Sequence, residues 1–386
     1  MSNLKHVYLD YCATTPVDPD VIEVMLPYFN QDYGNPSSVH RFGQRAEAAL
    51  EQARADIADC LNCLPEEIYF TSGGSESNNL AIRGSAFESR KRSGKDHLIT
   101  TGVEHPAVLQ TVIDLNRNFG YSSSVVGVNS YGMVEMDELE RLLTDRTILV
   151  SAICANNEIG TINPIQEMAL LCHKKGVLFH TDAVQAAGLL KIDLKDLPVD
   201  LLSIGAHKFY GPKGVGVLFI RRGTPIQPIQ TGGSHERGFR AGTSNIPYIV
   251  GMAAALKIAV GKRNADSVTL SNFRDHLIQA VQQSIPNAIL TGHPIERLPN
   301  HASFVFPGVD GNILVALLDH AGFACSSGSA CKTGDPQPSE VLIAIGIDPE
   351  TALGSLRVSI GRETLKEEID SFCQVLPDLV TKAKLR

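Results

Sequence analysis

Three short segments of the chain carry side chains that can act together on one small molecule. The first, at 68–79, reads Ile-Tyr-Phe-Thr-Ser-Gly-Gly-Ser-Glu-Ser-Asn-Asn, an apolar strand pattern that runs through a Gly-Gly turn into a helix pattern. Backbone N–H groups around Gly74 at such a helix start, together with the hydroxyl of Ser75, form a site suited to a phosphate group. Taken alone, the segment also fits an ordinary strand-to-helix turn.

The second segment, His180-Thr-Asp182-Ala-Val-Gln185, has an acid at the carboxyl end of an apolar strand. Ligands of open α/β sheets bind at this position. An aspartate there can pair with a pyridinium nitrogen and keep it protonated, so that the ring accepts electrons. Gln185 can donate a hydrogen bond to a ring hydroxyl. Asp182 by itself fits a helix cap equally well.

The third segment is Ser203-Ile-Gly-Ala-His207-Lys208-Phe-Tyr-Gly-Pro-Lys-Gly, in which a lysine follows an apolar strand and precedes a glycine-rich turn. A lysine that is partly removed from water near a phosphate has a lowered pKa and can form a Schiff base. An isolated His-Lys pair in a loop is more often solvated surface. All three segments follow strands, and their conjunction predicts a pyridoxal 5'-phosphate site with the cofactor on Lys208.

Strand patterns alternate with helix patterns in the part of the chain that carries these segments. Short apolar runs rich in β-branched residues lie at 68–71, 97–101, 147–153, 177–181, 201–204 and 215–220. Strands that alternate with helices predict a mainly parallel sheet covered on both faces, an α/β fold. A 3.6-residue apolar period, after the start signal Asn35-Pro36-Ser37, predicts a helix over 38–60.

The pattern changes at about Gly261. A long amphipathic helix is followed by proline-containing loops and by short strands near 303–306 and 356–360. This change predicts a second, smaller α+β domain. We therefore expect a large cofactor-binding domain over 16–262 and a small domain formed by 1–15 with 263–386.

Composition narrows the class of protein. The chain has 386 residues, of which 43% are hydrophobic, and its net charge of −8 comes without a long lysine or arginine run, so no direct nucleic-acid partner is expected. No apolar stretch approaches the roughly 20 residues of a membrane span, and we expect a cytoplasmic protein without a membrane partner. Its eight scattered cysteines are typical of reduced thiols. Cys60 and Cys63 form a C-x-x-C pair with no second pair at metal spacing, and no metal is predicted.

These segments resemble the cysteine desulfurases, within the class V aminotransferase group of fold type I pyridoxal-phosphate enzymes. The resemblance covers nearly the whole chain and implies a mainly parallel seven-stranded sheet flanked by helices, plus a smaller α+β domain. Further matching motifs are Tyr8-Leu-Asp-Tyr-Cys-Ala-Thr-Thr-Pro16, Gly34-Asn-Pro-Ser-Ser, Glu104-His105, Asn156-Asn157-Glu-Ile-Gly160, Gly232-Gly-Ser-His-Glu-Arg237, Arg240-Ala-Gly-Thr243, Ser326-Ser-Gly-Ser-Ala-Cys331 and Arg357.

The resemblance also implies roles for individual residues. His105 is expected to stack on the cofactor ring and move protons, and Asn157 to contact the ring hydroxyl or the substrate. Arg357 is expected to bind the substrate carboxylate, for which a guanidinium is well shaped, and Asn35 is a further substrate contact. Thr243 is expected to reach the phosphate of a neighbouring subunit, which implies a homodimer.

The segment at about 324–337 carries the implied sulfur chemistry. It consists of small and turn-forming residues with little to bury, so we expect a mobile loop whose thiol can travel. Cys331 matches the family nucleophile, whereas Cys325 on the same loop is expected to be structural. The resemblance thus implies conversion of L-cysteine to L-alanine with a persulfide on Cys331. The sulfur then passes to an acceptor protein, such as an iron-sulfur scaffold.

Two departures from the family pattern affect these expectations. Gly205 stands where some relatives have a hydroxyl residue that binds phosphate, so Ser75, His207 and backbone donors carry more of that contact. The chain ends at Arg386 without the longer tail that some desulfurases use to hold a scaffold protein. The identity of the acceptor and the pathway served therefore stay open.

Three other functions share part of this residue set. A cysteine or cystine C–S lyase needs no counterpart of Cys331 and releases pyruvate and ammonia in place of alanine. A selenocysteine lyase shares almost every residue named. A non-enzymatic sulfur carrier, a different class of protein, would be expected to lack Lys208 or Asp182, and the chain has both.

Overall fold

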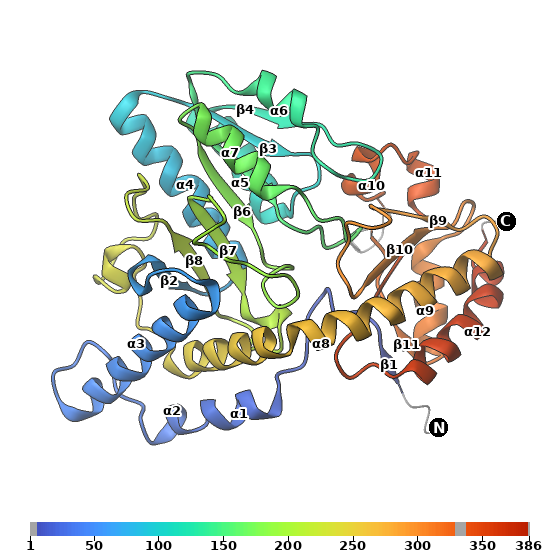
Figure 1. Cartoon of the computed structure of the whole chain (residues 1–386), viewed down its shortest axis with the longest axis horizontal. Coiled ribbons are helices and arrows are strands. Elements are labelled where there is room, and N and C mark those ends of the chain that lie inside the picture. Colours follow the sequence, from blue (N-terminus) through green and yellow to red (C-terminus); the bar gives the residue numbers. More distant parts are fainter. Residues whose placement is uncertain (1–5, 329–336, 385–386) are drawn as a thin grey trace.

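The computed structural model describes residues 6–328 and 337–384 (Figure 1). Its main feature is a seven-stranded sheet. Strand β8 pairs antiparallel with both β2 and β7, and all other neighbouring strands of the sheet are parallel. In spatial order the strands are β2 (Ile68–Thr71), β8 (Gly216–Ile220), β7 (Leu201–Gly205), β6 (Leu178–Asp182), β5 (Thr147–Ile153), β3 (His97–Thr101) and β4 (Ser122–Val126). The expected α/β fold with a mainly parallel seven-stranded sheet is confirmed.

One strand of this sheet has no counterpart among the six apolar runs of the sequence. β4 begins with three serines and lies at the edge, where it pairs with β3 alone. An edge strand with one face open to solvent needs little apolar side-chain area. Its polar sequence therefore hides it from a search for buried strands.

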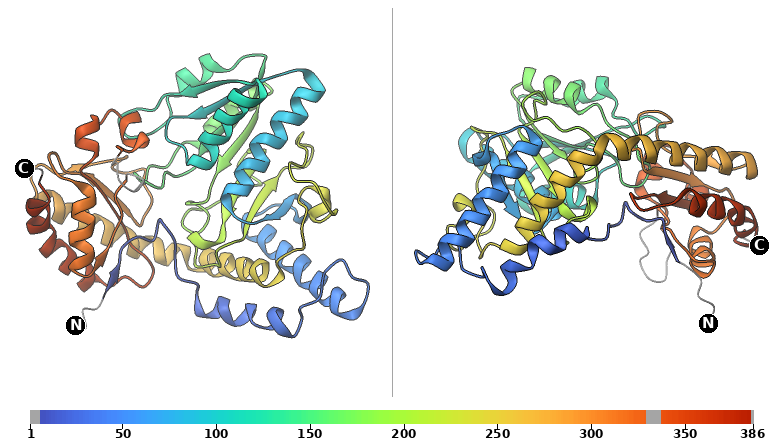
Figure 2. Two further views of the ribbon diagram at one scale, coloured as in Figure 1. Left: turned by 180° about the vertical axis from the view of Figure 1, so that it is seen from behind. Right: turned by 60° about the horizontal axis from the view of Figure 1, so that its bottom comes forward.

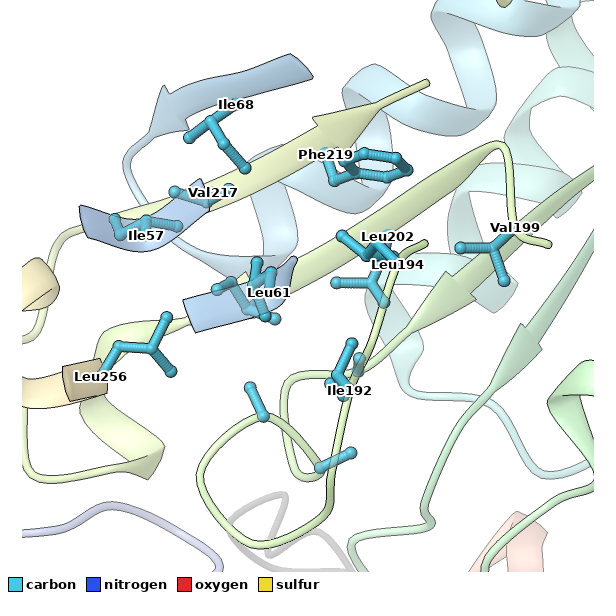
Figure 3. Close-up of a cluster of buried hydrophobic side chains, with 14 of the residues drawn as sticks. Ile57, Leu61, Ile68, Ile192, Leu194, Val199, Leu202, Val217, Phe219 and Leu256 are labelled. Carbon is cyan, nitrogen blue, oxygen red and sulfur yellow. The ribbon is translucent and has the colours of Figure 1, made fainter. Parts of the chain in front are cut away.

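Helices cover both faces of the sheet, and successive strand residues point to opposite faces. The helices α4 (Gly74–Ser93) and α5 (Pro106–Phe119) pack on one face, over a core that includes Leu201 and Leu218. The opposite face packs against α3 (Arg41–Leu61), α7 (Ile165–Lys174) and the first part of α8 (Ile246–Ser284). Figure 3 shows part of the core on this opposite face, where side chains of α3 and α8 lie against β7 and β8. Shorter helices on the large sheet's side are α1 (Pro19–Met25), α2 (Pro27–Asn30), α6 (Met136–Leu142) and the 3₁₀ turn η1 (Pro65–Glu67).

The helix expected over 38–60 is α3, and it starts three residues later, at Arg41. The ring of His40 caps it by accepting a hydrogen bond from the backbone N–H of Gly43 at 3.3 Å. The helix ends where Asn62 adopts the left-handed conformation at φ 54°. The start signal read at Asn35 thus belongs to the loop before the helix.

A second hydrophobic core lies among the C-terminal elements. It joins the small sheet β12–β10–β9 to the short parallel pair β1–β11, and Figure 2 shows the N-terminal strand β1 beside these late elements. The strands are β1 (Val7–Tyr8), β9 (Ile289–Leu290), β10 (His301–Val305), β11 (Phe323–Ala324) and β12 (Ser355–Ser359). The helices are α9 (Gly311–His320), α10 (Glu340–Ala344), α11 (Pro349–Ala352) and α12 (Lys366–Lys382).

One continuous helix of 39 residues, α8, runs from the large sheet to the second core (Figure 1). It begins at Ile246, well before the change of pattern at Gly261, where the sequence first indicates a long helix. Its first part is buried around Met252 and Leu256 in the large core, whereas only separate positions such as Leu270 and Leu277 are buried in its second part. The amphipathic period therefore emerges only after the helix has left the large sheet.

Membrane-spanning helices, metal-binding clusters and disulfide bonds are absent from the described residues. No helix among those residues is long and apolar enough to cross a lipid bilayer. The same residues contain no cluster of three or more His, Cys, Asp or Glu side chains arranged to hold a metal ion. Seven cysteines fall in the described part, and all are free thiols.

Candidate active site

A cavity of about 320 Å³ opens at the carboxyl ends of the central parallel strands. It brings together nine of the residues that the sequence singles out, drawn from both cores. They are Gly74, Ser75, His105, Asn157, Asp182, Gln185, His207, Lys208 and Arg357. Parallel strands end at one edge of a sheet, which explains why segments far apart in the chain meet here.

Lys208 lies directly after β7, at the end of the 3₁₀ turn η2 (Ala206–Lys208). Its Nζ donates hydrogen bonds to the backbone carbonyls of Cys12 at 2.5 Å and Ala13 at 2.7 Å. Burial lowers the pKa of the Lys208 amine to about 8, because removal from water disfavours the charged form. An amine with this pKa has a substantial neutral fraction near pH 7 and can attack an aldehyde.

Asp182 is the last residue of β6 and is buried. Its Oδ2 accepts a hydrogen bond from Asn78 Nδ2 at 2.6 Å, and its Oδ1 accepts one from the backbone N–H of Val184 at 2.9 Å. These two donors fix the orientation of a carboxylate that faces the cavity. Gln185, on the following turn, donates from Nε2 to the carbonyl of Cys12 at 2.8 Å, which is the carbonyl that Lys208 also contacts.

The start of α4 forms the anion-binding end of the cavity. Gly73 precedes the helix with φ 150° and no side chain caps the first turn, so its backbone N–H groups remain available to a ligand. Gly74 has no room for a larger residue, because an added Cβ would lie 2.5 Å from Val184 Cγ2. An adjoining open hollow is lined by Ser75, His207 and Lys213. Burial, followed by the charge of Lys208, lowers the pKa of His207 to about 4, so its ring is neutral.

His105 caps the first turn of α5, and its Nδ1 accepts a hydrogen bond from the N–H of Ala107 at 3.0 Å. Because Nδ1 is an acceptor, the proton of the neutral ring is on Nε2. Burial lowers the pKa of His105; the charge of Asp182 opposes this effect and that of Lys208 adds to it. A neutral imidazole with a fixed tautomer can stack on an aromatic ring and exchange a proton.

Arg357 enters the cavity from β12, a strand outside the seven-stranded sheet. Its Nη2 pairs with Asp10 Oδ1 at 2.8 Å, and its Nη1 donates to the carbonyl of Asn157 at 3.2 Å. Its Nε is buried and has no hydrogen-bond partner among the described residues. The guanidinium thus keeps donor capacity for a carboxylate ligand.

Two of the predicted residues that the structure describes, Asn35 and Thr243, do not line this cavity. Asn35 is exposed in the loop between α2 and α3, where its Oδ1 accepts from the N–H of Ser37 at 3.0 Å. Thr243 is exposed in the segment before α8. Cys331 lies outside the described residues. Cys325 is buried, and this burial raises the pKa of its thiol.

Sequence reasoning gave no role to three residues that hold the site together. The carbonyl of Cys12 accepts from both Lys208 and Gln185, Asn78 orients Asp182, and Asp10 pairs with Arg357. All three lie in segments that the sequence resemblance already includes. A backbone carbonyl leaves no side-chain signature, and the Asp10 pair joins residues 347 positions apart, so neither role follows from local spacing.

The residues present fit pyridoxal 5'-phosphate. The uncapped start of α4 suits a phosphate, the fixed carboxylate of Asp182 suits a pyridinium nitrogen, and Lys208 is a half-buried amine with a lowered pKa, suited to an aldehyde. All three face one cavity large enough for a small heteroaromatic molecule. The sheet, the helix start and the lysine therefore define a pyridoxal-phosphate enzyme of fold type I.

Comparisons with known proteins agree with this class. The family model described as Aminotransferase class-V matches residues 7–372. The cysteine desulfurase IscS of Clostridium botulinum is 45% identical over 382 residues, which cover 98% of this chain and 96% of that protein. The IscS of Methanosarcina thermophila is also 45% identical, over 98% of this chain and 93% of its own length. A solved NifS-like protein superposes with a TM-score of 0.91 at 38% identity, covering 98% of this chain and all of the other.

The chain belongs to the class-V aminotransferase family and, within it, to the pyridoxal-phosphate-dependent cysteine desulfurases. The resemblance read from the sequence is confirmed.

Proposed function

We propose that this chain converts L-cysteine to L-alanine and transfers the sulfur through a persulfide on Cys331. The observation that carries the proposal is that Lys208, Asp182 and Arg357 line one cavity, in a chain that is a desulfurase relative over its whole length. An amine with a lowered pKa, a buried acid and a guanidinium are the groups needed for proton transfer, charge stabilisation and carboxylate binding at an amino acid.

Each side chain of the cavity has a distinct task in this proposal. Arg357 binds the carboxylate of the substrate and so directs its Cα towards Lys208. Lys208, when neutral, removes the proton from Cα and returns a proton later in the cycle. Pyridoxal 5'-phosphate, when bound, supplies the electron sink that accepts the resulting charge. Asp182 keeps the ring nitrogen protonated, and His105 stacks on the ring and exchanges protons through Nε2.

The sulfur step uses the thiol of Cys331. Its thiolate attacks the substrate sulfur, so that an S–S bond forms as the C–S bond breaks, and the electron pair of the C–S bond stays with the substrate carbon. That carbon takes up a proton, and alanine leaves. Cys325 is a poor candidate for this step, because burial raises the pKa of its thiol and disfavours the thiolate.

One assay tests this function against the alternatives. Purified protein is incubated with L-cysteine and a thiol reductant, and alanine, pyruvate and sulfide are quantified. We expect equal amounts of alanine and sulfide. Pyruvate with ammonia would identify a C–S lyase, and faster turnover of L-selenocysteine than of L-cysteine would favour a selenocysteine lyase. If neither alanine nor pyruvate formed, the assignment of an enzyme that acts on L-cysteine would be overturned.

We also propose that the enzyme is a cytoplasmic homodimer that delivers sulfur to an acceptor such as an iron-sulfur scaffold protein. Asn35 and Thr243 support the dimer, because both are exposed and lie apart from the cavity of their own subunit. In this proposal Thr243 reaches the phosphate of the neighbouring subunit. Sedimentation that finds a fully active monomer at assay concentrations would rule the dimer out.

We propose, finally, the domain division 16–262 and 1–15 with 263–386, with the catalytic-cysteine loop at about 324–337 in the small domain. The separate hydrophobic cores support this division. The boundary at 262 falls inside α8, which links the two cores without a break. Limited proteolysis is therefore expected to cut the protein at loops and to spare the residues around 262.

A further inference from the structure

The chain segment after β1 is held between two strands of the second core (Figure 2). The N–H of Leu9 donates to the carbonyl of Ala324, the last residue of β11, at 2.9 Å. On its other side, the N–H of Ser359 at the end of β12 donates to the carbonyl of Leu9 at 2.8 Å. Asp10, the next residue, forms a parallel bridge with Ser359. Its backbone position is thus fixed from both sides.

The carboxylate of Asp10 makes two contacts, one with each oxygen. Oδ1 accepts from Arg357 Nη2 at 2.8 Å, and Oδ2 accepts from the hydroxyl of Ser326 at 2.7 Å. Ser326 and Arg357 also contact each other, because the N–H of Arg357 donates to the carbonyl of Ser326 at 2.7 Å. Asp10, Arg357 and Ser326 therefore form a closed triangle of contacts.

This triangle restricts the guanidinium more than a simple ion pair does. The Arg357 side chain is 9% exposed and that of Asp10 15%, so water does little to screen their attraction. The carboxylate holds one side of the guanidinium through Nη2, and the carbonyl of Asn157 holds Nη1. Five N–H donors are available on an arginine, and two are used in these contacts. Nη1 and Nη2 each keep a further N–H for a ligand, in a plane that these contacts fix, while the buried Nε has no partner among the described residues.

We propose that Asp10 is a positioning residue that orients Arg357 for the carboxylate of the amino-acid substrate, with Ser326 holding the carboxylate of Asp10 in place. This inference rests on the proposed function of Arg357 as the substrate's carboxylate contact. Orientation and charge predict opposite effects of Asp10→Asn on the affinity for a carboxylate ligand. If Asp10 were only a counter-ion, its negative charge would weaken the attraction of Arg357 for a second carboxylate, and Asp10→Asn would bind the ligand more tightly. If Asp10 orients Arg357, the same variant binds the ligand more weakly.

Two small ligands isolate this effect without turnover. L-Alanine and ethylamine differ only in the carboxylate, and their binding to the holoenzyme is measured by the shift of cofactor absorbance and by calorimetry. For Asp10→Asn we expect the Kd of L-alanine to rise about tenfold and that of ethylamine to stay within about twofold of wild type. Equal weakening of both ligands, or tighter binding of L-alanine, would overturn the proposal.

A double-mutant cycle shows whether Asp10 acts through Arg357. In the Arg357→Lys background, which loses the planar fork, Asp10→Asn should cost L-alanine less than about twofold in Kd. A tenfold cost in that background would also contradict the inference. Ser326→Ala, a milder change that leaves the ion pair intact, should raise the Kd of L-alanine by about twofold to threefold. No change in this variant would exclude the role given to Ser326.

The failure of this inference is distinguishable from failure of the proposed function. If wild-type enzyme binds L-alanine no better than ethylamine, Arg357 is not the carboxylate contact and the role of Asp10 falls with it. The production of alanine from L-cysteine, measured in the separate turnover assay, would still stand or fall by itself.

Discussion

The two walls of the cavity are built in different ways. Asp182 ends β6 and Lys208 follows the neighbouring strand β7, and the register that pairs Asp182 with Ile153 and Ser203 fixes their separation. We call this the sheet wall. Arg357 comes from β12 of the second core, on what we call the second-core wall, and it is placed by Asp10, which is 347 residues away in sequence, and by the carbonyl of Asn157, 200 residues away.

The difference predicts that the geometry of the two walls responds differently to substitution. The sheet wall rests on strand ladders inside a large buried core, so its geometry should persist when single side chains change. The second-core wall depends on side-chain contacts between segments far apart in the chain, so substitutions there should alter ligand affinity before they alter the fold. The predictions below compare the walls, from the largest expected effect to the smallest.

The strongest test of the sheet wall is Lys208→Ala. This change removes both the proposed cofactor attachment and the proposed base for the Cα proton, so alanine formation should fall by about 10⁴-fold or more. Peptide mapping after borohydride reduction should find the cofactor on Lys208 in wild type and on no lysine of the variant. Lys257→Ala, on the surface beside Asp56, is the matched control and should keep full activity. Cofactor found on Lys213 would refute the assignment.

The second test concerns the thiol of Cys331, the proposed persulfide carrier. Cys331→Ser should keep cofactor and L-cysteine binding but lose alanine formation by about 10³-fold or more, because a hydroxyl is a far poorer nucleophile at neutral pH. Cys325→Ser, its matched control, should retain most activity. Undiminished alanine from Cys331→Ser would end the persulfide mechanism, and pyruvate from this variant would shift the assignment to a lyase.

The same contrast explains what the sequence could predict. The end of an apolar strand can be recognised from local sequence, so residue type and position are enough to identify Asp182 and Lys208. The structure brings both residues to one cavity. The helix start at Gly74 was found in the same way. Local pattern could not find β4, whose serines carry no burial signal, or the true start of α8, whose first part is apolar on several faces.

Long-range contacts account for the rest. The pairing of Asp10 with Arg357 and the shared carbonyl of Cys12 depend on how the N-terminal segment lies between β11 and β12. Neither has a periodicity or a spacing that a single sequence displays. Arg357 itself was identified only through the family resemblance, since a single arginine on a short strand has no distinguishing local context.

A third test separates charge from orientation on the sheet wall. Asp182→Asn keeps the shape of the side chain but loses the charge that stabilises a protonated ring nitrogen, so turnover should fall by about 10²-fold. Asn78→Ala removes a hydrogen bond to Asp182 and leaves its charge, and about a tenfold loss is expected. Cofactor absorbance as a function of pH provides a readout independent of turnover. Equal losses in the two variants would mean that orientation, and not charge, is the main contribution of Asp182.

The smallest expected effect is a shift in pH dependence that reports how far the sheet wall removes Lys208 from water. Burial lowers the pKa of this amine to about 8, and only the neutral amine attacks an aldehyde. The rate at which apoprotein attaches pyridoxal 5'-phosphate should therefore rise about tenfold between pH 7 and pH 9 and then level off.

The solvated lysine of N-acetyl-lysine amide provides the reference, since its amine has a pKa of about 10.4 and its rate should still be climbing at pH 10. Measuring both reactions under the same conditions cancels the ionisations of the cofactor itself. The lowered pKa values of His105 and His207 keep these rings neutral across this range, so they add no step of their own. If the protein and the reference give parallel profiles, Lys208 is solvated and the sheet wall does not prepare its amine for attack.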